Sequence, residues 1–333
     1  MTSFDETRDA DAHFAQRFEF QVSERKKAIA SYQKALILYE ALAKAHPAVP
    51  EYQSNLANTH YNMGILFLET DRRLEAEVSY QKALILYEAV AKADPTVPEY
   101  QSNLANTHYN LADLFDDTDR PGEALASYQK ALTFRADLAK AHPTELKYQS
   151  KLANTHYNMG ILFRAIGRPE EAIASYQKAL ILYEALAKAD PTVPEYQSNL
   201  ANTHDILGDL FGEDRSLEAE ESYQEALTIR EALTKAHPTV NEYQSDLANT
   251  HNAQGNLFLQ MDHLDCYRQA EVSYQKALTI RAALAKADPT VTEYQSDLAN
   301  SHENLGIIFH ATGRPEEAEV SFQDAEAIRA KIR

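Results

Sequence analysis

The stretch that decides the fold is LANTHYNMGILFRAIGRPEEAIASYQKAL, residues 152–180, because versions of both its ends recur along the chain. The end block, SYQKAL, returns in steps of 47 to 51 residues, with its aromatic residue at Tyr32, Tyr80, Tyr128, Tyr176, Tyr223, Tyr274 and Phe322. The first block, LANTH or LANSH, returns from Leu56 to Leu298 with matching steps. Self-similarity at a period of about 20 to 50 residues is typical of solenoids and other repeat proteins, so we expect a repeat architecture.

Apolar spacing predicts two helices in each repeat. Around Tyr176 the apolar residues return after three or four positions and fall on one helical face: Ala172, Tyr176, Ala179, Tyr183 and Leu186. A similar stripe over residues 145–166 contains Leu152, Thr155, Met159, Leu162, Phe163 and Ile166. We name the earlier segment of each repeat helix A and the later one helix B. One such hairpin cannot bury its apolar stripe alone, so each repeat must pack on the next.

Glycine and proline mark the expected helix ends. The string GRPE at 167–170 should end helix A and begin helix B, because glycine permits a left-handed residue and proline suits a first helical turn. The Thr-x-Pro-Glu strings at 96–99 and 192–195 predict a capping box at the start of helix A. The prolines at 143 and 191 should stop the preceding helix B.

Composition and charge narrow the class of protein. The 333 residues are 44% hydrophobic and 25% charged with nine glycines, which favours an all-α fold. The formal charge of −18 would repel a phosphate backbone, so we expect no nucleic-acid partner. Cys266 is the only cysteine, which excludes an intrachain disulfide and fits a cytoplasmic setting. Residues 1–11 lack a basic, apolar leader and no apolar run reaches about 18 residues, so we expect neither export nor a membrane partner.

The unit around Tyr176 resembles the tetratricopeptide repeat family. The matching small and aromatic positions are Tyr157, Asn158, Met159, Gly160, Phe163, Gly167, Ala172, Tyr176 and Ala179. The resemblance implies a right-handed α-solenoid, a superhelix of helix-turn-helix hairpins. Histidines such as His156 stand where the family often has tryptophan, and the period exceeds the family's about 34 residues. The chain is therefore similar to extended-helix, bacterial-type repeats of about 48 residues, with lengthened helices.

The repeat pattern also predicts how the chain is divided. Residues 1–23 look like a degenerate, polar helix A that caps the N-terminal end. Residues 24–333 form the solenoid, with about six full repeats and a final capping helix over 315–332. Glu326 replaces the leucine of earlier copies there, which makes the last helix more polar and disfavours open-ended stacking.

The resemblance implies that the concave groove, lined by helix A, binds a protein or peptide. Carried over repeat by repeat, it selects Asn58, Tyr61, Asn62, Ile65, Asn106, Tyr109, Asn110, Asp113, Asn154, Tyr157, Asn158, Ile161, Asn202, Asp205, Asp209, Asn249, Asn252, Asn256, Asn300, Glu303, Asn304 and Ile307. Amide groups could pair with an extended ligand while tyrosines supply apolar contact. The alternative is that the asparagines only cap or cross-link helices. None of these positions is basic, so we expect a basic or neutral partner segment with apolar anchors rather than an acidic tail.

The sequence contains no string that predicts an active site, and we expect no catalytic, cofactor or metal residues and no enzyme activity. The repeated histidines should be core or interhelix residues, because stacked helices lie too far apart for shared metal ligation. Asp262, His263, Asp265 and Cys266 accompany a three-residue insertion. A loop insertion is the favoured interpretation over a metal site, because four ligands within five residues rarely reach tetrahedral geometry.

Three functions are consistent with this sequence. The first is a scaffold or adaptor that binds a protein segment in the concave groove. The second is a self-associating structural solenoid, a dimer or filament, with a weak homo-oligomer as its mildest form. The third is a non-catalytic regulatory subunit of an enzyme complex.

Overall fold

The computed structural model describes residues 3–261 and 263–332, with side chains described from residue 24 onward. Every regular element among these residues is helical, which confirms the all-α prediction. The helices in chain order are α1 (Ser3–Ala45), α2 (Pro50–Leu68), α3 (Arg73–Ala93), α4 (Pro98–Asp117), α5 (Pro121–Ala141), α6 (Leu146–Ala165), α7 (Pro169–Ala189), α8 (Pro194–Phe211), the short 3-10 helix η1 (Glu213–Arg215), α9 (Ser216–Ala236), α10 (Asn241–Gln260), α11 (Leu264–Ala287), α12 (Thr292–Ala311) and α13 (Pro315–Ile332).

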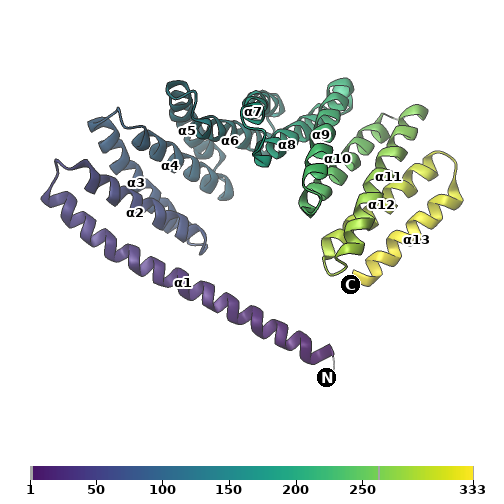
Figure 1. The fold of residues 1–333 in the computed structure, drawn as a ribbon, viewed down its shortest axis with the longest axis horizontal. Helices are drawn as coiled ribbons and strands as arrows, with labels where there is room; N and C mark the ends of the chain where they lie inside the picture. Colours follow the sequence, from purple (N-terminus) through teal and green to yellow (C-terminus); the bar gives the residue numbers. More distant parts are fainter. Residues whose placement is uncertain (1–2, 262, 333) are drawn as a thin grey trace. The chain divides into compact units, whose positions relative to one another are not determined.

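The chain divides into two compact units, Met1–Leu162 and Phe163–Arg333. In the first unit α2 packs on α3 and α4 on α5, while α1 contacts α2 and α3 contacts α4. In the second unit each helix from α7 to α13 packs on the next one. Within each unit the helices alternate in direction and are joined by short turns (Figure 1). Each unit is therefore a stack of helix A and helix B hairpins, the arrangement of an α-solenoid, with even-numbered helices as helix A and odd-numbered ones as helix B.

Helices A and B approach closely because a glycine on one faces an aromatic ring on the other. A Cβ atom placed on Gly64 of α2 would lie 2.5 Å from Cε1 of Tyr80 on α3, well inside van der Waals contact. Tyr80 is fully buried, so its ring has no room to move away. The same contact recurs in the second unit between the pairs Gly208 and Tyr223, Gly255 and Tyr274, and Gly306 and Phe322. The aromatic residue of SYQKAL thus fills the space that the absent side chain leaves.

A left-handed residue ends helix A and brings an arginine back over a phenylalanine. Gly167 has φ of +72°, as the sequence predicted, and Asp119 takes this place with φ of +57° in the first unit. The next residue then donates its backbone N–H to the phenylalanine carbonyl, at 2.8 Å from Arg120 to Phe115 and from Arg168 to Phe163. This is the Schellman pattern, and it satisfies a carbonyl at the helix end. The guanidinium of Arg120 lies 4.3 Å from the Phe115 ring centre, a cation–π contact.

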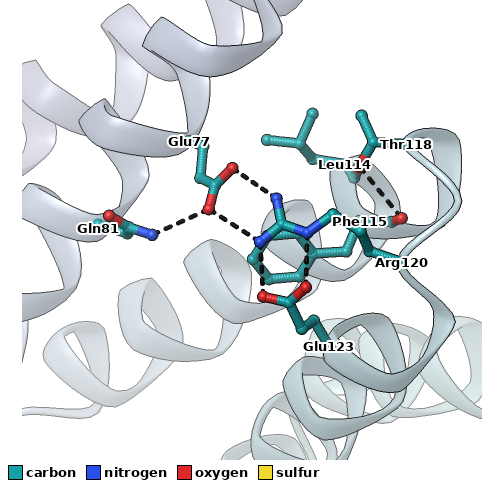
Figure 2. A network of polar contacts seen from close by, with 7 residues as sticks. All are labelled: Glu77, Gln81, Leu114, Phe115, Thr118, Arg120 and Glu123. Atoms are coloured by element: carbon teal, nitrogen blue, oxygen red, sulfur yellow. Dashed lines mark hydrogen bonds and ion pairs between the residues drawn. The ribbon is translucent and has the colours of Figure 1, made fainter.

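Arg120 also connects two consecutive B helices (Figure 2). Its guanidinium donates to Glu77 on α3, at 2.7 and 3.2 Å, and to Glu123 on α5, at 2.5 Å for both contacts. In the second unit Arg314 makes the equivalent contacts with Glu271 on α11 and Glu317 on α13. These ion pairs join neighbouring repeats near the N-terminal ends of their B helices.

The predicted capping boxes are wrong. Val97 and Val193, not the threonines, occupy the N-cap positions of α4 and α8, and neither helix has a side-chain cap. The Thr96 N–H and hydroxyl instead donate to Asp94 Oδ1, at 3.1 and 2.6 Å. Asp94 is the residue just before Pro95, so its carboxylate forms a local turn that competes for the threonine. Proline in the first turn of α4 and α8 is confirmed.

The first helix differs from the expected boundary at residue 23. α1 runs without interruption from Ser3 to Ala45, so residues before 24 do not form a separate helix A. The stretch contains neither proline nor glycine, and nothing in it favours a turn. Figure 1 shows α1 extending beyond α2 and α3. Capping of the stack by either chain end stays a prediction.

A bilayer-spanning helix would need both length and an apolar surface. None of the helices in the described part of the chain has this combination.

Candidate protein-binding face

In five of the six LANTH or LANSH blocks the asparagine bonds to helix B of its own repeat. Its Oδ1 accepts a hydrogen bond from the residue seven positions after the SYQKAL aromatic. The pairs and distances are Tyr87 to Asn58, 2.5 Å; Arg135 to Asn106, 3.3 Å; Arg230 to Asn202, 2.7 Å; Arg281 to Asn249, 2.8 Å; and Arg329 to Asn300, 3.0 Å. These five asparagines therefore cross-link the two helices of a hairpin, which is the alternative interpretation of that motif.

The sequence analysis did not identify these helix-B partners. Arg135, Arg230 and Arg281 are only 5 to 6% exposed, yet they reach the helix-A face that had been described as free of basic residues. Arg135 also donates to Thr155 Oγ1 at 2.7 Å and lies 4.3 Å from the Tyr109 ring centre. The signal in the sequence was that both tyrosine and arginine occur at this position, which a purely apolar core position would not show.

A second set of predicted residues links consecutive repeats. Asn110 Nδ2 donates to Tyr61 Oη at 3.0 Å, and Asn158 Nδ2 donates to Tyr109 Oη. In the second unit Asn304 Nδ2 donates to Asn252 Oδ1 at 2.8 Å. Burial raises the pKa of Tyr61, and that of Tyr109 to about 12, so both rings stay neutral at physiological pH. These residues form a ladder of bonds along the A helices of each unit.

Asp205 takes the tyrosine position in the second unit and forms a buried ion pair with Arg230. Thr250 Oγ1 donates to Asp205 Oδ2 at 3.0 Å, and Asp246 lies 3.7 Å from the Arg230 guanidinium. Burial raises the pKa of Asp205 to about 6, although Arg230 and the Thr250 hydrogen bond act in the opposite direction. Desolvation therefore outweighs the attraction of a close cation at this site.

The raised pKa of Asp205 predicts a specific pH dependence of stability. The folded chain binds this proton more tightly than the unfolded chain, so its contribution is greatest below about pH 4 and is lost as the pH rises through about 6. We expect the wild type to lose about 2 kcal/mol relative to Asp205→Asn between pH 4 and pH 7. Urea unfolding of both proteins at several pH values measures the difference. Parallel stability profiles would contradict the assignment.

The predicted residue that lies seven positions after the LANTH or LANSH asparagine, here called the outer residue, differs between repeats. Asp113 accepts from the Tyr128 hydroxyl, Asp209 from Tyr223 at 2.5 Å, and Asn256 from Tyr274 at 2.7 Å. The remaining repeats have isoleucine here: Ile65 is half-buried, whereas Ile161 and Ile307 are 36% and 41% exposed. Ile161 and Ile307 therefore expose part of their apolar side chains.

The structure brings two of the predicted residues together in one pocket. Asp209 of α8 and Asn256 of α10 line a cavity of about 150 Å³, together with Ala253 and Gln260. We use the name A face for the surface formed by all the helix-A residues that were predicted to bind a partner, of which this pocket is one part. Its other predicted members, Asn62, Asn154, Tyr157 and Glu303, are half-buried, and Glu303 pairs with Arg329.

Three of the repeated histidines, His60, His108 and His251, are buried, and the other three are half-buried. His108 and His251 are 4% and 3% exposed, and burial lowers the pKa of each to about 4, so both are neutral at physiological pH. In the insertion, Asp262 lies outside the described residues, and His263 Nδ1 accepts from the Asp265 N–H at 3.4 Å at the start of α11. Among the described residues, no three acidic, histidine or cysteine side chains are grouped to hold a metal ion.

Two models of the tetratricopeptide repeat match the sequence, at residues 105–138 and 153–185. The chain contains tetratricopeptide repeats at these two stretches. Both matches begin at the alanine of LANTH and end within helix B, so the tetratricopeptide core occupies the inner part of each hairpin. The remaining residues of the repeat lengthen the two helices. Proteins with tetratricopeptide repeats bind other proteins or peptides.

Some solved structures are similar to this chain at low sequence identity. The S. pombe nuclear import adaptor Nro1 is 13% identical and has a TM-score of 0.51, with 84% of this chain and 95% of that chain covered. The C-terminal part of a TPR repeat-containing protein from Cytophaga hutchinsonii is 15% identical, with a TM-score of 0.48 and coverage of 93% and 95%. No curated protein matches the chain in sequence.

Proposed function

We propose that the chain is a protein-interaction scaffold that binds a segment of a partner protein on the A face. The observation that carries this proposal is the pocket between α8 and α10, where Asp209 and Asn256 present polar groups beside a small apolar wall. Consecutive A helices repeat this surface at regular spacing, which suits an extended ligand.

The charges on the A face favour a basic or neutral segment with apolar anchors. Arg135, Arg230 and Arg281 are buried and already bonded to asparagine, aspartate or backbone oxygen, and the half-exposed Arg329 is paired with Glu303, so these arginines are not free to hold an acidic tail. Asp209, by contrast, is exposed, and among the described residues it accepts a single hydrogen bond, from Tyr223. Ile307 offers an apolar contact on α12. We place this activity in the cytoplasm and without catalysis, in keeping with a single free cysteine.

Selection from a random peptide library on the purified chain tests this proposal. Binding of the selected peptides is then measured by calorimetry for the wild type and for Asp209→Lys/Asn256→Lys. We expect basic or neutral sequences whose affinity falls at least about tenfold in this variant, because two side chains at the pocket are replaced by cations. Glu231→Lys, a change at an exposed position of α9, is the control and should bind normally.

Selection of acidic peptides, or equal binding to the double variant, would contradict the proposed site. Light scattering over a concentration series addresses the alternative of a self-associating solenoid. Growth of the apparent mass in proportion to protein concentration, with no peptide selected, would favour that function instead.

A further inference from the structure

A second groove lies between α7 and α9, on the opposite face of α8 from the A face. It has a volume of about 470 Å³. Leu180, Leu207 and Phe211 form its apolar floor, and His204 lies beside them. At about 100° per residue, His204, Leu207 and Phe211 point roughly 160° away from Asn202, Asp205 and Asp209. The groove is therefore a surface separate from the proposed binding face.

Glutamates surround this apolar floor. Glu184 comes from α7, and Glu218, Glu221 and Glu225 come from one side of α9. Arg215 pairs with Glu218 at 3.1 Å while its guanidinium lies 4.1 Å from the Phe211 ring centre. The other three glutamates are exposed, and within the described residues they have no ion pair. Burial lowers the pKa of His204, so this ring adds no positive charge at neutral pH.

The other repeats show that the hairpin does not require these acids. A smaller cavity of about 240 Å³ occupies the same place in the first unit, lined by Leu36, His60 and Phe67. There Val78 and Lys82 stand where α9 has Glu221 and Glu225. The residues at the Glu221 position in the other later repeats are Ala126, Ala174, Val272 and Val320, and at the Glu225 position Lys130, Lys178, Lys276 and Asp324. Only α9 has two glutamates here.

We propose that the groove between α7 and α9 docks a lysine- or arginine-bearing segment of a partner protein. The aliphatic stem of such a side chain packs on Leu180, Leu207 and Phe211, and its cationic group meets Glu184, Glu221 and Glu225. Charge complementarity selects this occupant: the groove has three unpaired carboxylates, whereas in the first unit Lys82 supplies a cation of the chain's own. This inference does not depend on the A face.

The probe for this groove is the basic peptide Ac-KLRK-NH2, with the acidic peptide Ac-ELEE-NH2 as its counterpart. Both are titrated into methyl-labelled full-length chain at physiological ionic strength and observed by NMR. We expect the basic peptide to shift the methyl signals of Leu180 and Leu207 but not that of Leu36 in the first unit. The acidic peptide should leave all three unchanged.

Glu221→Ala/Glu225→Lys gives α9 the residues of its sister repeats, so it should fold normally, as circular dichroism can verify. We expect it to bind the basic peptide at least about tenfold more weakly, since two contacts to the cations are lost. Glu40→Ala/Glu88→Lys changes the net charge equally at exposed positions in the first unit and is the matched control. It should bind within about twofold of the wild type.

Three results would overturn the proposal. Equal loss of binding in both variants, or equal shifts at Leu36, would mean that the basic peptide is attracted by the overall negative charge of the chain and not by this groove. Unchanged binding by the α9 variant would remove the groove from the interaction. Displacement of the peptide from Leu180 and Leu207 by an equimolar amount of spermidine would identify the site as one for small polyamines.

Discussion

Replacing Gly64 with valine is expected to lower the free energy of unfolding by about 3 kcal/mol or more. A Cβ at this position would lie 2.5 and 2.6 Å from two carbons of the Tyr80 ring, and Tyr80 is fully buried between α2 and α3. The hairpin can accept the new side chain only by separating its helices, which exposes the surrounding core. Urea unfolding followed by circular dichroism measures the change.

Alanine variants provide graded controls for the glycine contact. Ala112 already occupies the equivalent place against Tyr128, so the fold can adjust to a single methyl group, and Gly64→Ala should cost less than the valine change. At Gly122, in the first turn of α5, an added Cβ would meet nothing within 4 Å. Gly122→Ala should be neutral or stabilise by about 0.5 kcal/mol. Equal destabilisation by the alanine and valine variants of Gly64 would show that the close approach is not what matters.

Replacing Arg230 with alanine is expected to lower the free energy of unfolding by about 3 kcal/mol at pH 7.5. The change leaves Asp205 buried without its cation and removes the hydrogen bond to Asn202. The loss should be smaller at pH 5, because the Asp205 pKa, already about 6, would rise further without Arg230 and the carboxyl would be neutral. Urea unfolding at the two pH values measures both effects.

Two further variants distinguish this buried pair from an ordinary ion pair. Arg329 makes the equivalent contacts with Asn300 and Glu303, but its side chain is 42% exposed, so Arg329→Ala should cost less than about 1 kcal/mol. Asp205→Tyr/Arg230→Tyr reproduces the Tyr61 and Tyr87 combination of the first unit. This double variant should recover most of the stability lost in Arg230→Ala. Equal losses at Arg230 and Arg329 would indicate that burial is not the cause.

The fold could be predicted from sequence because its signals are local and repeated. Apolar spacing around Tyr176 predicted helix B, and Gly167 predicted the left-handed turn that the structure contains. The repeated histidines were expected to be core or interhelix residues, and three of the six are buried. Each of these inferences needs only neighbours within about one helical turn or one repeat.

The binding face was harder to predict, because its properties depend on contacts between helices. The arginines at 135, 230 and 281 are far in sequence from the asparagines they contact, and each lies on helix B rather than helix A. The predicted capping boxes were wrong because the Thr96 hydroxyl bonds to the Asp94 carboxylate instead of capping the helix. Asp94 lies outside the Thr-x-Pro-Glu pattern, so the pattern could not predict this bond. The boundary at residue 23 was wrong because polarity alone does not break a helix.

The bond from Asn110 to Tyr61 joins positions 49 residues apart in two adjacent repeats. Two adjacent repeats therefore fit together only when each supplies the matching side chain. Asn158 makes the same bond to Tyr109. Excision of residues 98–145 would therefore bring Asn158 opposite Tyr61, the same pair of side chains that each of these two bonds joins. As far as this bond is concerned, one whole repeat can be lost from this part of the chain without leaving a mismatched pair.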